Sequence, residues 1–133
     1  MMTRERLLRK FLDARRAEPF RPSLSDCAMF AADWIEELTG TDPAAQWRGQ
    51  YRTLEEGRAL LLADGFASPA EVLASILLPD AGWMQAQAGD VVVLIEAGDE
   101  AMGIVGGGHI HVLRPLRGLG AVPLNRAVRI YRP

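Results

Sequence analysis

Residues 25–30, Ser25-Asp26-Cys27-Ala28-Met29-Phe30, contain the chain's only cysteine and stand at the predicted start of a helix. The side chains of Ser25 and Asp26 can accept hydrogen bonds from the free backbone N–H groups of a first helical turn. Cys27 would then lie in that turn, where the positive end of the helix dipole favours the thiolate and hence nucleophilicity. The simpler alternative, a small buried apolar side chain, is the commoner role of a lone cysteine.

Length and composition indicate one domain over residues 1–133, long enough to bury a core. Hydrophobic residues at 49% and charged residues at 24% are typical of a soluble globular protein. The 15 basic and 17 acidic residues give a net charge of −2, so we expect no attraction to nucleic acid. One cysteine excludes an internal disulfide, and we find neither a signal peptide nor an apolar run of the roughly 20 residues needed for membrane insertion.

Four helices are predicted in the first part of the chain from the spacing of apolar residues and from capping residues. Their predicted ranges are 3–17, 26–38, 53–64 and 68–78. Gly40 follows the second helix as a left-handed cap, and Asp42 with Pro43 starts a short helical turn. Ser68 and Glu71 have the spacing of a capping box at the start of the fourth helix.

The loop from Gln46 to Tyr51 carries two large aromatic side chains, Trp47 and Tyr51, around Gly49. Aromatic residues in such a loop either line a cleft or anchor the loop to the core. The sequence leaves both interpretations open.

The pattern changes to β-branched residues after Gly89-Asp90. The run Val91–Ile95 predicts a strand buried on both faces, and the glycines at 106–108 predict a tight turn between two further strands. Predicted strands cover residues 91–95, 101–105, 109–113 and 126–132. Helices followed by strands indicate an α+β fold with an antiparallel sheet.

The order of these motifs resembles the NlpC-type cell-wall peptidases, which are small papain-like cysteine hydrolases. Asp26-Cys27-Ala28 stands where that family usually has Asp-Cys-Ser, and the family's cysteine is the nucleophile. Gly89-Asp90-Val91-Val92 resembles the family's Gly-Asp-Leu-Val, and residues 101–105 resemble its His-Val-Gly-Ile-Tyr strand. The resemblance implies a papain-like (NlpC-type) fold, with N-terminal helices packed on a small C-terminal antiparallel β-sheet.

A closer resemblance, covering nearly the whole chain, is to small uncharacterised proteins encoded among the tail genes of phages and prophages. It rests on three segments, 26–34, Thr39-Gly40-x-Asp42-Pro43 and Trp47-Arg48-Gly49-x-Tyr51. This resemblance implies a place in the virion tail, with other tail-tip and hub proteins as partners. Assembly of the particle in the bacterial cytoplasm would account for the absence of a signal peptide.

The sequence departs from the peptidase pattern at the general base, because the position of the catalytic histidine is Ala101. The segment Ile110-His111-Val112 resembles the family's Ile-His-Ala, which carries a third, orienting residue. His111, or less readily His109, is therefore the candidate orienting residue or substitute base for Cys27. The alternative for both histidines is a strand residue that faces solvent or a neighbouring subunit.

Other sites receive little support from the sequence. His109 and His111 could supply two metal ligands, but Cys27 is the only further cysteine or histidine, so no metal is expected. The glycines at 106–108 lack the Lys-Ser/Thr ending of a phosphate-binding loop, so no nucleotide or other cofactor is expected.

We therefore expect a structural component of a phage tail tip, built on a degenerate NlpC-type domain that is not an efficient enzyme. One alternative is an active cysteine peptidase or amidase that cleaves peptidoglycan during entry, with Cys27 as nucleophile and Asp26 as the adjacent helix cap. The other is a tail assembly factor that is absent from the mature particle.

Overall fold

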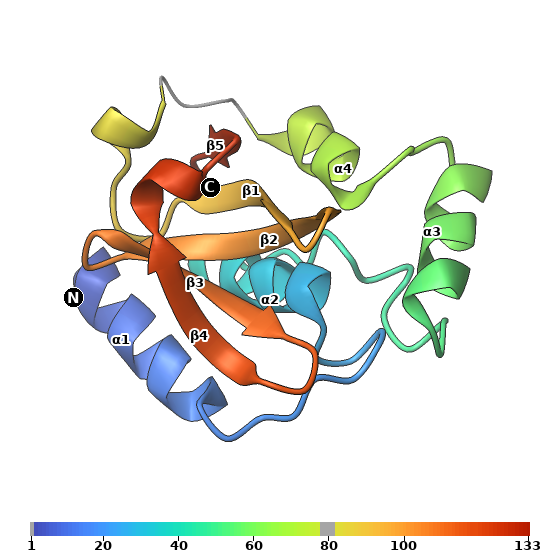
Figure 1. Ribbon diagram of the computed structural model, residues 1–133, viewed down its shortest axis with the longest axis horizontal. Coiled ribbons are helices and arrows are strands. Elements are labelled where there is room, and N and C mark those ends of the chain that lie inside the picture. Colours follow the sequence, from blue (N-terminus) through green and yellow to red (C-terminus); the bar gives the residue numbers. More distant parts are fainter. Residues whose placement is uncertain (1, 78–81) are drawn as a thin grey trace.

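The computed structural model describes residues 2–77 and 82–133, which form four α-helices and a five-stranded antiparallel sheet (Figure 1). The helices are α1 (Arg4–Arg15), α2 (Cys27–Thr39), α3 (Leu54–Ala63) and α4 (Pro69–Ile76). The strands are β1 (Val91–Glu96), β2 (Asp99–Gly106), β3 (His109–Arg114), β4 (Gly118–Pro123) and β5 (Arg129–Tyr131). The predicted α+β fold with an antiparallel sheet is confirmed.

The sheet has the order β4-β3-β2-β1-β5, so the four consecutive strands form a meander and β5 returns to the outer side of β1. Val93 lies opposite Met102 in the β1–β2 pair, and Ile104 lies opposite His111 in the β2–β3 pair. The three strands predicted first are thus confirmed. The last strand is shorter than predicted, because a 3₁₀ turn, η2 (Leu124–Arg126), occupies its expected start.

Strand β4 was not predicted from the sequence. Its residues, Gly-Leu-Gly-Ala-Val-Pro, contain two glycines and a proline, all of which are depleted in strands. Antiparallel pairing with β3 over six residues, from Arg114–Gly118 to His109–Pro123, forms the strand in spite of this composition, in a hairpin joined by residues 115–117.

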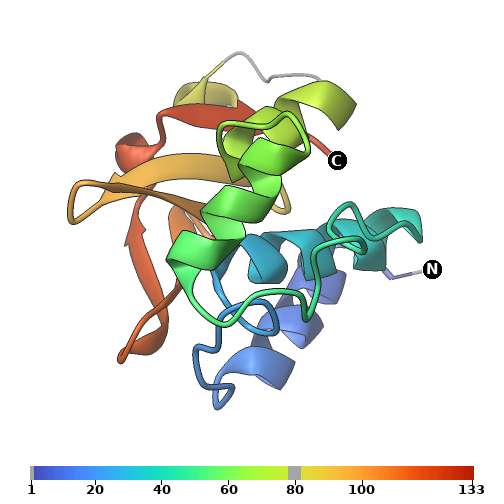
Figure 2. The same cartoon turned by 90° about the vertical axis from the view of Figure 1, so that its right-hand side faces the viewer.

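The core consists of two apolar clusters, one on each face of the sheet. Val91 and Val93 face α1 and α2, where they meet Phe11, Phe30 and Trp34. Alternate residues of the same strands, such as Val92, Leu94 and Val105, form the cluster on the other face. Figures 1 and 2 show α1 and α2 on one side of the sheet, with α3 and α4 at the end away from the start of α1. The prediction of a strand buried on both faces holds for Val91–Leu94, whereas Ile95 is 46% exposed.

Local hydrogen bonds start three of the four helices. Asp26 caps α2 as predicted, Thr3 caps α1, and Thr53, whose role as a cap was not predicted, forms a full capping box with Glu56 at α3. The start of α4 differs from the predicted capping box. The Ser68 side chain makes no capping hydrogen bond, and the Glu71 carboxylate accepts a hydrogen bond from the N–H of Ala67 instead. The predicted end of this helix, Leu78, lies outside the described residues, and α4 ends at Ile76.

Candidate functional site

Asp26 organises the segment that leads into α2. Its carboxylate is buried and accepts hydrogen bonds from the N–H groups of Ser23, at 2.9 Å, and Met29, at 2.8 Å. It also accepts from the hydroxyl of Tyr51, which lies 25 residues further along the chain. One carboxylate therefore fixes the helix start, the turn before it and the loop that carries Tyr51.

The aromatic loop both anchors to the core and lines a cavity. Trp47 donates from Nε1 to the Asp64 carboxylate at 2.7 Å, and its ring packs edge-on against Phe66 with centroids 5.8 Å apart. Arg48 adds ion pairs to Asp33, at 2.7 Å, and Asp42, at 2.9 Å. The sequence left these two roles as alternatives, and the structure assigns both to the same loop.

An apolar cavity of about 260 Å³ lies between α2, α3, α4, this loop and the tip of the β1–β2 hairpin. Small side chains of α2, including Ala28, Ala31 and Ala32, line it. Trp47 and Leu61 also line it, as do Cys27 and its neighbours Asp26 and Tyr51.

The Cys27 thiol is held in its protonated form. Burial, with a smaller contribution from the neighbouring Asp26 carboxylate, raises its pKa from 9.0 to about 11, although a hydrogen bond from the backbone of Met102 acts in the opposite direction. A position in the first turn of a helix favours the thiolate, but here burial has the larger effect. The raised pKa of Cys27 therefore disfavours the thiolate that the sequence led us to expect at this helix start.

The structure does not bring a histidine to the thiol. The groups that act on Cys27 are the Asp26 carboxylate and nearby backbone groups, and no imidazole of residues 2–77 or 82–133 is among them. Cys27 packs instead against the apolar cluster that includes Ala101, the position where the resemblance places the general base.

His111 and His109 both contact the turn between β2 and β3. Nε2 of His111 lies 3.1 Å from the carbonyl oxygen of Gly106, and Nδ1 of His109 lies 3.1 Å from that of Gly107. Burial lowers the pKa of His111, which favours its neutral form. Cys27 contacts the backbone of Met102, whereas His111 contacts the backbone of Gly106. These two positions are four residues apart, which is roughly 13 Å along an extended strand.

A family model described as a domain of unknown function, DUF6950, matches residues 1–133. The chain belongs to the DUF6950 family. Curated proteins gave no match to the chain.

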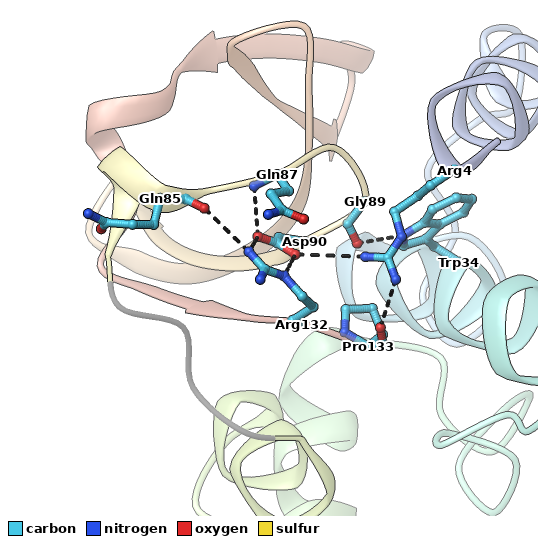
Figure 3. Close-up of polar contacts among 8 residues, drawn as sticks. All are labelled: Arg4, Trp34, Gln85, Gln87, Gly89, Asp90, Arg132 and Pro133. Atoms are coloured by element: carbon cyan, nitrogen blue, oxygen red, sulfur yellow. Dashed lines mark hydrogen bonds and ion pairs between the residues drawn. The ribbon is translucent and has the colours of Figure 1, made fainter.

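The DUF6950 chain contains a second polar cluster, around the fully buried Asp90 (Figure 3). The Asp90 carboxylate accepts hydrogen bonds from Nε and Nη2 of Arg132, at 3.0 and 3.1 Å, and from the N–H of Gln87 at 2.9 Å. Arg4 approaches it to 3.9 Å and donates to the carbonyl of Pro133 at 3.1 Å. Beside them Trp34 donates from Nε1 to the carbonyl of Gly89 at 2.8 Å.

The Asp90 cluster joins the start of β1 to α1, to α2 and to the residues after β5. The motif Gly89-Asp90-Val91-Val92 was recognised in the sequence, but the partners of Asp90 were not, because Arg132 lies 42 residues away. The fully buried carboxylate accepts three hydrogen bonds that join segments distant in sequence, so the contacts it makes in the DUF6950 fold are structural.

Metal and membrane sites are not found in the described parts of this DUF6950 chain. Residues 2–77 and 82–133 contain no group of three or more His, Cys, Asp or Glu side chains able to hold a metal ion. None of the helices in these ranges has the length and apolarity needed to cross a membrane.

Proposed function

We propose that this DUF6950 chain is a non-catalytic structural component of a phage or phage-like tail tip, built on a degenerate papain-like domain of the NlpC type. The observation that carries the proposal is the environment of Cys27, whose pKa is raised by burial and which packs beside an apolar cluster with no imidazole of residues 2–77 or 82–133 acting on it. General-base assistance is typically worth 10²–10⁴-fold in rate, and a cysteine with a raised pKa lacks the thiolate that would attack a peptide bond.

The arrangement of elements supports the papain-like part of the proposal. In the NlpC-type peptidases that the sequence resembles, a helix starting at the cysteine packs on an antiparallel sheet. Here α2 starts at Cys27 and packs against the sheet, with Trp34 and Ile35 in the cluster shared with β1 and β2. The tail-tip position, the tail and hub partners and the assembly in the bacterial cytoplasm rest on the resemblance to phage tail-gene proteins.

The catalytic part of the proposal is tested with purified peptidoglycan. Wild-type protein and the Cys27→Ser variant are incubated with sacculi, and released fragments are measured by chromatography and mass spectrometry. We expect both proteins to release no more than buffer. Release by the wild type alone would support the alternative of an active peptidase or amidase, with Cys27 as nucleophile and His111 as orienting residue or substitute base.

The location is tested in particles produced from the phage or prophage that encodes the chain. We expect mass spectrometry to find the chain in purified particles and deletion of its gene to give defective tails. A defect without the chain in the particle would support the assembly-factor alternative. Normal tails after deletion would contradict a structural role.

A further inference from the structure

The cavity beside Cys27 is large enough to hold a sizeable apolar group. Its volume of about 260 Å³ exceeds the roughly 150 Å³ of an apolar protein cavity that binds benzene. Its lining includes three short side chains of α2, Ala28, Ala31 and Ala32, which leave more room beside the helix than larger side chains would. The space therefore matches one large apolar side chain, such as phenylalanine.

The opening of the cavity carries an unbalanced negative charge. Arg58, Asp99 and Glu100 line it, and Arg58 lies 3.7 Å from Asp99 in an exposed ion pair. Glu100 is exposed, and within residues 2–77 and 82–133 it makes no ion pair. A basic group bound next to the apolar one would pair with this carboxylate.

We propose that the cavity receives an extended segment of a partner chain, with a large apolar side chain inserted and an adjacent lysine or arginine paired with Glu100. Interfaces depend on a few such anchors, in which a buried aromatic or aliphatic side chain fills a pocket and a polar rim sets the register. This inference rests on the proposed function, because a structural tail component binds partner chains without cleaving them.

Binding is measured with three short peptides and the isotope-labelled protein. The peptides are N-acetyl-Phe-Arg-amide, N-acetyl-Ala-Arg-amide and N-acetyl-Phe-Glu-amide, and their dissociation constants come from shifts in two-dimensional NMR spectra. We expect the Phe-Arg peptide to bind best, with shifts at residues that line the cavity. Loss of the phenyl ring should weaken binding at least about tenfold, the range expected for burial of one aromatic side chain.

Matched substitutions test whether the apolar side chain of the peptide enters the cavity. Ala44 lines the cavity from the loop, whereas its neighbour Ala45 is exposed and does not. Ala44→Leu should fill part of the space and abolish binding, while Ala45→Leu should bind as the wild type does. Near-UV circular dichroism checks that both variants are folded.

A charge reversal tests the rim without altering the core. In Glu100→Lys the preference for the Arg peptide over the Glu peptide should invert. The ratio of the two dissociation constants should change by about two- to fivefold at low salt. Glu37→Lys, at an exposed position of α2 away from the cavity, should leave the preference unchanged.

Four results would overturn the inference. Three of them are equal affinity for the Phe-Arg and Ala-Arg peptides, shifts that map away from the cavity, and unchanged binding by a folded Ala44→Leu protein. Equal binding of toluene and the Phe-Arg peptide would mean that the cavity takes a small apolar molecule and would also overturn it. Hydrolysis of the peptides in the same samples would contradict the proposed function while leaving the cavity assignment intact.

Discussion

Folded Cys27 should react with iodoacetamide about 100-fold more slowly at pH 8 than the same cysteine in the urea-unfolded chain. Only the thiolate reacts, and its fraction at pH 8 is about one in ten for a pKa of 9.0 and about one in a thousand for a pKa of about 11. Because Cys27 is the only cysteine, intact-mass spectrometry reports its modification directly. The Cys27→Ser variant gives the background.

The dependence on pH separates protonation from steric protection. Poor access slows the reaction by the same factor at every pH, whereas a raised pKa makes the rate climb about tenfold per pH unit up to about pH 10. We therefore expect a steep rise with no plateau below pH 10. A plateau reached near pH 7, or a folded protein that reacts faster than the unfolded chain, would show an activated thiolate and refute the reasoning.

The same pKa shift affects stability with a definite sign. The folded state holds the thiol proton more tightly than the unfolded state, so the stabilisation is complete below about pH 9 and is lost as the pH rises to about 11. A pKa difference of this size corresponds to about 2–3 kcal/mol in the free energy of unfolding. In urea unfolding, the wild type should lose more stability between about pH 9 and 11 than the Cys27→Ala variant does. Equal dependence of stability on pH in the two proteins would contradict the raised pKa.

Three further predictions concern the fold. Asp90→Asn should lower the free energy of unfolding by about 2–4 kcal/mol in urea titrations, because it leaves Arg132 and Arg4 without their buried counter-charge. The control Asp13→Asn, in an exposed ion pair, should change the free energy of unfolding by less than about 0.5 kcal/mol. Gly103→Ala should cost about 1–3 kcal/mol or more, since its Cβ would lie 2.5 Å from Ile110 and 2.7 Å from a backbone oxygen. Gly120→Ala, with its nearest atom at 3.4 Å, should be nearly neutral by the same measurement. His111 has a lowered pKa, so the wild type should lose stability as the pH falls from about 7 to 5, and His111→Gln should lose less. Identical pH profiles for these two proteins would contradict the assigned shift.

Local signals explain which parts of the fold could be predicted. The caps at Thr3, Asp26 and Thr53 are satisfied within a few residues, and the two-glycine turn before His109 requires only neighbouring backbone. Strand β4 depends on pairing with β3 and carries no alternating pattern of its own. Pairing within the β3–β4 hairpin therefore determines this strand, and its composition did not reveal it.

The candidate site likewise has features that neighbouring residues predict and features that depend on distant contacts. The place of Cys27 in the first turn of α2 follows from its neighbours in sequence, and the structure confirms it. Its protonation depends on burial by packing against distant segments, which no local pattern encodes. The bond from Tyr51 to Asp26 and the pair between Arg132 and Asp90 likewise join residues 25 and 42 positions apart.

The three tryptophans lie in three different environments and give the molecule distinct optical reporters. Trp34 is fully buried against the sheet, Trp47 stands in the cavity wall with 7% exposure, and Trp83 is 46% exposed. A buried indole emits at shorter wavelength than one in water, so single-tryptophan variants would separate the signals. Emission from Trp47 would follow occupation of the cavity, while emission from Trp34 would follow the melting of α2 away from β1.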